Sequence, residues 1–105
     1  MNLIQWSYTR KYQIQAIFDS FPDMLFIFRS INSYYFIFTT KGIISVDSIP
    51  TRRDYVEMEL LINLELDRLQ SYINRRNHDE IEWINCWLEK KELPDINLEV
   101  SLRIK

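Results

Sequence analysis

Residues 51–76, TRRDYVEMELLINLELDRLQSYINRR, predict one long amphipathic helix from Thr51 to Arg76, around which the rest of the chain is arranged. Thr51 can cap the start of this helix, with Asp54 three residues further on, and Pro50 stops the preceding segment. Apolar side chains recur at spacings of three and four and form a stripe that faces the core. The members of this stripe are Tyr55, Met58, Ile62, Leu66, Leu69 and Ile73.

A second apolar set on the same helix consists of Val56, Leu60 and Leu64, on the side away from the main stripe. Either other segments of the chain cover this set or another molecule does, and cover by the chain itself is favoured because isolated exposed apolar residues are common. We expect a homodimer with two-fold symmetry, the commonest form of oligomer, with Leu60 or Leu64 at its interface. The other candidate interface for such a dimer is the final strand, since a terminal strand often lies at a sheet edge.

The segments outside the long helix predict mostly strands. Dense Phe, Tyr, Ile and Val residues favour strands in the middle of the chain, and clean alternation favours one at its end. Turns of hairpin length are expected between the middle strands, at Ile31-Asn32-Ser33 and at Lys41-Gly42. Apolar residues at helical spacing favour a helix after Thr9, and Asn77 with Glu80 matches the capping-box spacing of another helix. The expected elements are a strand at Asn2–Tyr8, a helix from Thr9 to about Ser20, strands at Met24–Arg29, Tyr34–Thr40 and Ile43–Ser48, a helix from Asn77 to about Glu92, and a strand at Asp95–Lys105.

These elements predict an α+β fold in one domain, residues 1–105. It would be a small two-layer sandwich of about five mostly antiparallel strands and three helices, in the order β-α-β-β-β-α-α-β. Apolar residues make up 47% of the chain, which argues against disorder. No long apolar run is visible, so we expect neither a membrane span nor a signal peptide, and a cytoplasmic location.

The residue types restrict the possible chemistry. Gly42 is the only glycine, which excludes a glycine-rich phosphate loop. The single cysteine, Cys86, and the single histidine, His78, are too few for a zinc site, and no cofactor is indicated. His78 stands at a helix start, where we expect it to be exposed to solvent. We expect Cys86 to be buried as a small apolar residue.

Two sets of residues are candidates for binding. The chain carries three Trp, six Tyr and six Phe, and aromatic strand residues such as Tyr34 and Tyr35 either fill the core or belong to a protein interface. The pairs Arg52-Arg53 and Arg75-Arg76 either lie on the solvated surface or hold a nucleic-acid backbone. The net charge of −2 makes a dedicated duplex-binding domain less favoured.

No motif in the sequence is specific enough to indicate an activity. The favoured hypothesis is a small non-enzymatic protein-interaction domain that binds or occludes a partner protein, as inhibitors, immunity proteins and phage-encoded host modulators do. The alternative is a nucleic-acid-associated regulator that uses the arginine pairs. The third hypothesis is a small enzyme built around His78.

Overall fold

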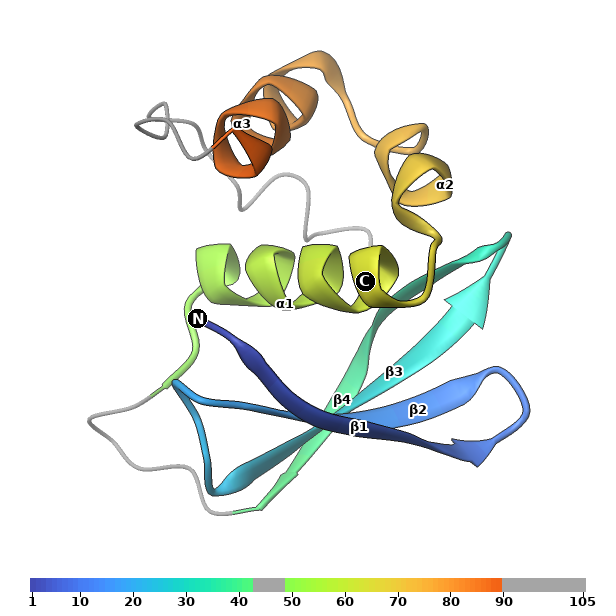
Figure 1. Ribbon diagram of the computed structural model, residues 1–105, viewed down its shortest axis with the longest axis vertical. Helices are drawn as coiled ribbons and strands as arrows, with labels where there is room; N and C mark the ends of the chain where they lie inside the picture. The colour runs from blue at the N-terminus through green and yellow to red at the C-terminus, as the bar shows by residue number, and fades with distance from the viewer. Residues whose placement is uncertain (43–48, 90–105) are drawn as a thin grey trace.

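Four antiparallel strands and three helices make up the part of the chain that the computed structural model describes, residues 1–42 and 49–89. The strands are β1 (Leu3–Arg10), β2 (Gln13–Phe18), β3 (Met24–Ile31) and β4 (Tyr34–Gly42). The helices are α1 (Arg52–Glu65), α2 (Leu69–Ile73) and α3 (His78–Leu88). The strands form one sheet in the order β1-β2-β3-β4, as Figure 1 shows. The predicted α+β class is therefore confirmed.

The segment from Thr9 to Ser20 contains the end of β1, a turn and strand β2, so the prediction of a helix there is wrong. Ile14, Ala16 and Phe18 alternate along β2 and are at most 1% exposed, which places every second side chain in the core. Tyr12 has a φ of 63°, and this left-handed residue reverses the chain between β1 and β2. The described elements therefore follow the order β-β-β-β-α-α-α.

A second tight hairpin joins β3 and β4, at the place where the sequence predicts a turn. Asn32 and Ser33 have φ values of 56° and 76°, the positive pair that a two-residue type I′ turn requires. Ile31 and Tyr34 face one another across this turn. The predicted strands at Met24–Arg29 and Tyr34–Thr40 are confirmed and slightly longer than expected, whereas those at Ile43–Ser48 and Asp95–Lys105 lie outside the described residues.

The predicted long helix is two helices, α1 and α2. Its start is as predicted, because Thr51 and Asp54 form a reciprocal capping box. It ends earlier, since Asp67 adopts a φ of 58° and the Arg68 N–H donates to the Asn63 carbonyl at 2.6 Å. A residue with left-handed φ cannot continue a right-handed helix, so the chain turns before α2 begins. The capping box predicted at Asn77 is also present, at the start of α3.

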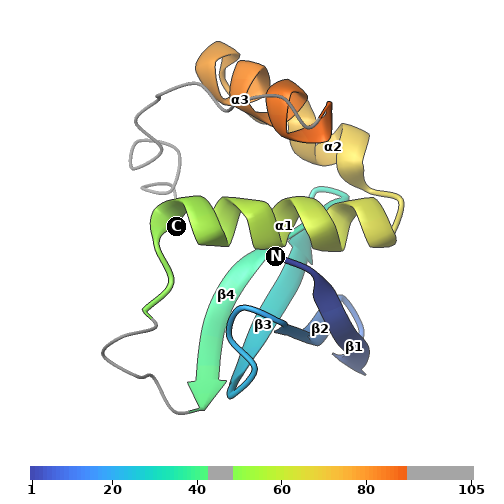
Figure 2. The same ribbon diagram turned by 60° about the vertical axis from the view of Figure 1, so that its left-hand side comes forward.

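Helix α1 lies between the sheet and the α2–α3 pair (Figures 1 and 2). Met58 and Ile62 face the sheet and pack against its core, which includes Phe26 and Phe28. On the other side of α1, a second cluster of buried residues consists of Val56, Leu60, Tyr72, Trp83 and Ile84. This arrangement explains why α1 carries apolar residues on two sides.

Two buried polar residues of α1, Glu59 and Asn63, bind the outer edge of β4. The Tyr35 N–H donates to Asn63 Oδ1 at 2.8 Å, and Asn63 Nδ2 donates to the Tyr35 carbonyl at 2.8 Å. One helical turn earlier, Glu59 Oε2 accepts from the Ile37 N–H at 2.8 Å. The helix therefore satisfies backbone groups that an edge strand would otherwise leave unpaired. Among the described residues no helix is long and apolar enough to span a membrane.

Candidate binding pocket at the hairpin tips

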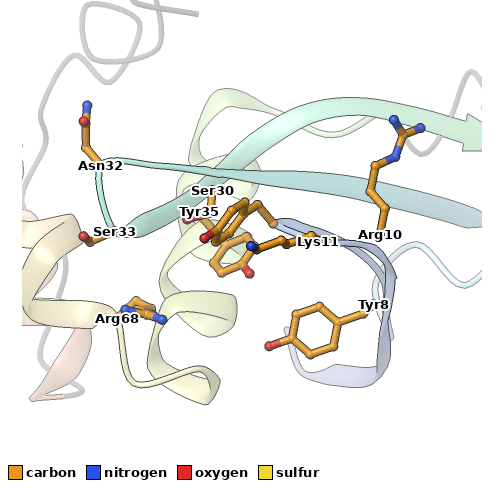
Figure 3. Close-up of a pocket in the computed structure, with 9 residues that line it drawn as sticks. Tyr8, Arg10, Lys11, Ser30, Asn32, Ser33, Tyr35 and Arg68 are labelled. Atoms are coloured by element: carbon orange, nitrogen blue, oxygen red, sulfur yellow. The ribbon is translucent and has the colours of Figure 1, made fainter.

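A pocket of about 730 Å³ opens where the β1–β2 turn, the β3–β4 turn and the α1–α2 connection meet (Figure 3). This volume is within the usual range of ligand sites. The residues that line it are Tyr8, Arg10, Lys11, Tyr12, Ser30, Asn32, Ser33, Tyr35 and Arg68. They come from three stretches of the chain that only the folded structure brings together.

The two hairpins place these side chains through tight turns with left-handed residues. Tyr12 in the first turn and the Asn32-Ser33 pair in the second all have positive φ. The Ser30 N–H donates to the Tyr12 carbonyl at 2.9 Å and thereby ties the first turn to β3. Backbone geometry therefore fixes where both turns stand at the rim of the pocket.

The charge of the pocket is positive. Arg10, Lys11 and Arg68 line it, and no carboxylate is among its lining residues, although the whole chain has a net charge of −2. Figure 3 shows Lys11 and Arg68 beside the opening with Tyr8, whereas the Arg10 side chain points away from this group. The Lys11 ammonium group also lies 5.1 Å from the centre of the Tyr12 ring. Two cations are thus placed to meet an anionic group.

The tyrosines of the pocket differ in exposure and role. Tyr8 and Tyr12 are each 60% exposed, whereas Tyr35 is almost fully buried. Burial raises the pKa of Tyr35 above its ordinary value of 10.0, Tyr8 adds to this rise, and the positive charge of Arg68 opposes it. The Tyr35 hydroxyl therefore stays protonated and can donate. Exposed tyrosine rings beside cations can contact both the apolar and the charged parts of a partner.

Of the aromatic residues singled out in the sequence, only one reaches the pocket. Tyr35 lines it, whereas Tyr34 packs edge to face against Tyr72, with ring centres 5.8 Å apart. The sequence left open whether the strand aromatics are core or interface, and the structure answers residue by residue. Phe26 and Phe28 are buried, and Phe38 is 49% exposed beneath the Arg29 guanidinium at 3.6 Å.

The arginine pairs predicted as binding residues do not line this pocket. Arg52 and Arg53 are exposed at the start of α1, and Arg75 is exposed after α2. Arg76 is only 8% exposed, lies 3.6 Å from Glu80 and sits over the Tyr72 ring. Arg76 is thus part of the helical core, which leaves three of the four arginines accessible to a partner.

The second apolar set of α1, like the arginine pairs, contains both buried and exposed residues. Val56 and Leu60 are 3% and 0% exposed and belong to the cluster between α1 and α3, so the chain itself covers them. Leu64 is 51% exposed. Only Leu64 of the three therefore offers a surface to another molecule.

The residues considered for catalysis lie on α3, away from the pocket lining. His78 is exposed at the first position of this helix, and Cys86 is half-buried near its end. Within residues 1–42 and 49–89, no group of three His, Cys, Asp or Glu side chains is placed to hold a metal ion.

Sequence reasoning missed most of the pocket. Arg68 was hidden in the expected long helix, and Tyr12 in the helix expected from Thr9. The available signal was the stretch Tyr8-Thr9-Arg10-Lys11-Tyr12, in which aromatic and basic residues lie close together. Such a stretch is typical of binding surfaces, but its partner Arg68 lies far along the chain.

Comparison with known proteins places the chain in a family. Residues 2–77 match the family model described as uncharacterised protein YuzH, and the chain therefore belongs to the YuzH family. The match spans the sheet, α1 and α2, includes every residue of the pocket, and ends where α3 begins. No curated protein and no solved structure matches the chain.

Proposed function

We propose that this chain is a small non-enzymatic protein-interaction domain that binds an acidic segment of a partner protein in the pocket at the hairpin tips. The observation that carries this proposal is the pocket lining, which combines three cationic side chains with three tyrosines and contains no carboxylate. Charge-assisted hydrogen bonds from arginine and lysine would hold the carboxylates of the partner. The exposed rings of Tyr8 and Tyr12 would contact the rest of the segment.

A protein partner fits the charge distribution better than a nucleic acid does. A nucleic-acid strand repeats its charge, so strong binding requires several basic residues along a track. Arg52, Arg53 and Arg75 do not line the pocket, and Arg76 is buried beside Glu80. The basic surface is therefore local, which suits a short acidic segment.

In this proposal the domain acts in the cytoplasm by occluding its partner. This mode of action is that of small inhibitors, immunity proteins and phage-encoded host modulators, and it requires binding alone. The backbone of both turns is fixed, so the ordering that opposes binding would be mainly that of exposed side chains such as Lys11 and Arg68. An enzyme around His78 has less support, because His78 lies outside the pocket lining.

The test is a titration of the ¹⁵N-labelled chain with a short Glu-rich peptide, followed by NMR. We expect the amide signals of Tyr8, Lys11, Ser33 and Arg68 to shift, with an affinity that falls as salt rises. The double variant Lys11→Ala/Arg68→Ala should bind about tenfold more weakly, the equivalent of about 1.4 kcal/mol for two partly exposed ion pairs.

The matched control is Arg52→Ala/Arg75→Ala, which removes the same charge from exposed positions outside the pocket. This control should bind the peptide as the parent does. Equal loss in both double variants, or no shift at the pocket, would overturn the proposal. Tighter, steeply salt-dependent binding of a single-stranded oligonucleotide would favour the nucleic-acid alternative instead.

A further inference from the structure

We infer that Asn63, which lies in the core, is the positioning residue of the pocket, because it ties the wall that carries Tyr35 to the wall that carries Arg68. This inference rests on the proposed function, since it concerns how the same pocket is held ready for its ligand. Asn63 is not a lining residue and is 0% exposed. Asn63 would therefore influence binding only through Tyr35 and Arg68, the two lining residues to which it is hydrogen-bonded.

The side chain of Asn63 holds the first wall. Its Oδ1 accepts from the Tyr35 N–H at 2.8 Å and its Nδ2 donates to the Tyr35 carbonyl at 2.8 Å. The same Nδ2 donates to the Glu59 carbonyl at 2.7 Å, which fixes the side chain against its own helix. Tyr35 is thus held by both backbone groups at one point of β4.

The backbone of Asn63 holds the second wall. Its carbonyl accepts from the Arg68 N–H at 2.6 Å, across the turn in which Asp67 has a φ of 58°. Arg68 extends from this turn into the pocket lining (Figure 3). Asn63 therefore sets the position of Tyr35 relative to Arg68 in the pocket.

The chemistry at this position requires an amide. Tyr35 presents one donor and one acceptor, and the Asn side chain supplies the complementary acceptor and donor. Leu at this position has nearly the same shape but leaves both Tyr35 groups without Asn63 as a partner. Because the Asn63 carbonyl remains, Arg68 keeps its bond, and only the tie to Tyr35 is broken.

A matched control lies in the same buried network. Tyr72 is 0% exposed and donates to Glu59 Oε1 at 2.7 Å, so Tyr72→Phe also removes a buried hydrogen bond without changing the charge. Tyr72 does not line the pocket. Both Asn63→Leu and Tyr72→Phe should lower stability, but only Asn63→Leu should alter binding.

The experiment compares these two variants of the full chain with the parent, in the peptide titration described above and in urea unfolding. We expect Asn63→Leu to weaken peptide binding by about tenfold while the protein remains folded, and Tyr72→Phe to leave the affinity within about twofold. If Asn63→Leu does not fold, Asn63→Ser takes its place in the experiment. The shorter Ser side chain cannot bond both backbone groups of Tyr35 as Asn63 does, and its hydroxyl keeps a polar group at the buried position.

The possible outcomes separate the two proposals. If the parent does not bind the peptide, the proposed function fails and the inference fails with it. If the parent binds and the folded Asn63 variant binds equally well, the proposed function stands and the positioning role is refuted. Loss of affinity in both variants to the same degree would also refute it, because instability would then explain the loss.

Discussion

Replacing Tyr72 with Phe tests whether the buried hydrogen bond between α1 and α2 stabilises the fold. The ring stays in place, so its packing in the second cluster and its contact with the Arg76 guanidinium, 4.5 Å from the ring centre, are retained. The change removes only the hydroxyl that donates to Glu59 Oε1 at 2.7 Å. Removing one partner of a buried hydrogen bond costs about 1–3 kcal/mol, so we expect a loss of about 2 kcal/mol.

Urea unfolding followed by circular dichroism measures this loss. For a domain of this size, about 2 kcal/mol corresponds to a fall in Tm of roughly 10 °C. Tyr12→Phe is the control, because Tyr12 is 60% exposed, and it should change stability by less than about 0.5 kcal/mol. If Tyr72→Phe is as mild as this control, the hydrogen bond does not stabilise the fold.

The same residue predicts a decline of stability at high pH. Burial raises the pKa of Tyr72 well above its ordinary value of 10.0, and Glu80 and Tyr34 add to this rise against the charge of Arg76. The folded protein therefore keeps the phenolic proton where the unfolded chain loses it. The stability that protonated Tyr72 contributes is complete below pH 10.0 and is lost as the pH rises further. The free energy of unfolding of Tyr72→Phe should therefore fall less over the same rise in pH.

Three further predictions concern other parts of the molecule. If α1 forms the interface of the predicted homodimer, Leu64→Glu should give a folded monomer, because Leu64 is 51% exposed. If sedimentation shows that the parent is a monomer at high concentration, the dimer is excluded. His78→Ala should leave stability and peptide binding unchanged, since His78 is exposed, and loss of function in the folded variant would revive the enzyme hypothesis. Gly42→Ala should lower the free energy of unfolding by about 1–3 kcal/mol, because Gly42 has a φ of 114° and a Cβ would lie 2.5 Å from the Asp23 carbonyl oxygen. An unchanged midpoint of urea unfolding would contradict this.

The features that could be predicted from the sequence are those with a local physical cause. Thr51 and Asn77 cap helices because their side chains reach backbone groups three residues away, and both caps are present. The turn at Asn32-Ser33 follows in the same way from residues that tolerate positive φ. The helix predicted from Thr9 to about Ser20 is wrong because Ile14 and Phe18 fit a helical spacing and also the alternating pattern of the strand that they form.

The features that escaped prediction depend on contacts between distant residues. Glu59 and Asn63 fall on a polar stripe that would normally face water, yet both are 0% exposed because the edge of β4 lies against them. The helix break at Asp67 required a left-handed residue at a position with no glycine. The pocket combines Tyr8, Lys11 and Arg68 from separate stretches, so no window of the sequence contains it.

The cover that α1 provides for β4 has a consequence for how this protein would fail when damaged. The strand begins Tyr34-Tyr35-Phe36-Ile37-Phe38, an uncharged aromatic run of the kind that stacks into cross-β fibrils when its backbone groups are free. In the folded state Asn63 and Glu59 occupy the outward amides of Tyr35 and Ile37. Variants in which α1 detaches from β4 should therefore form insoluble aggregates during expression. This should happen even where the loss of stability is too small to unfold the whole domain.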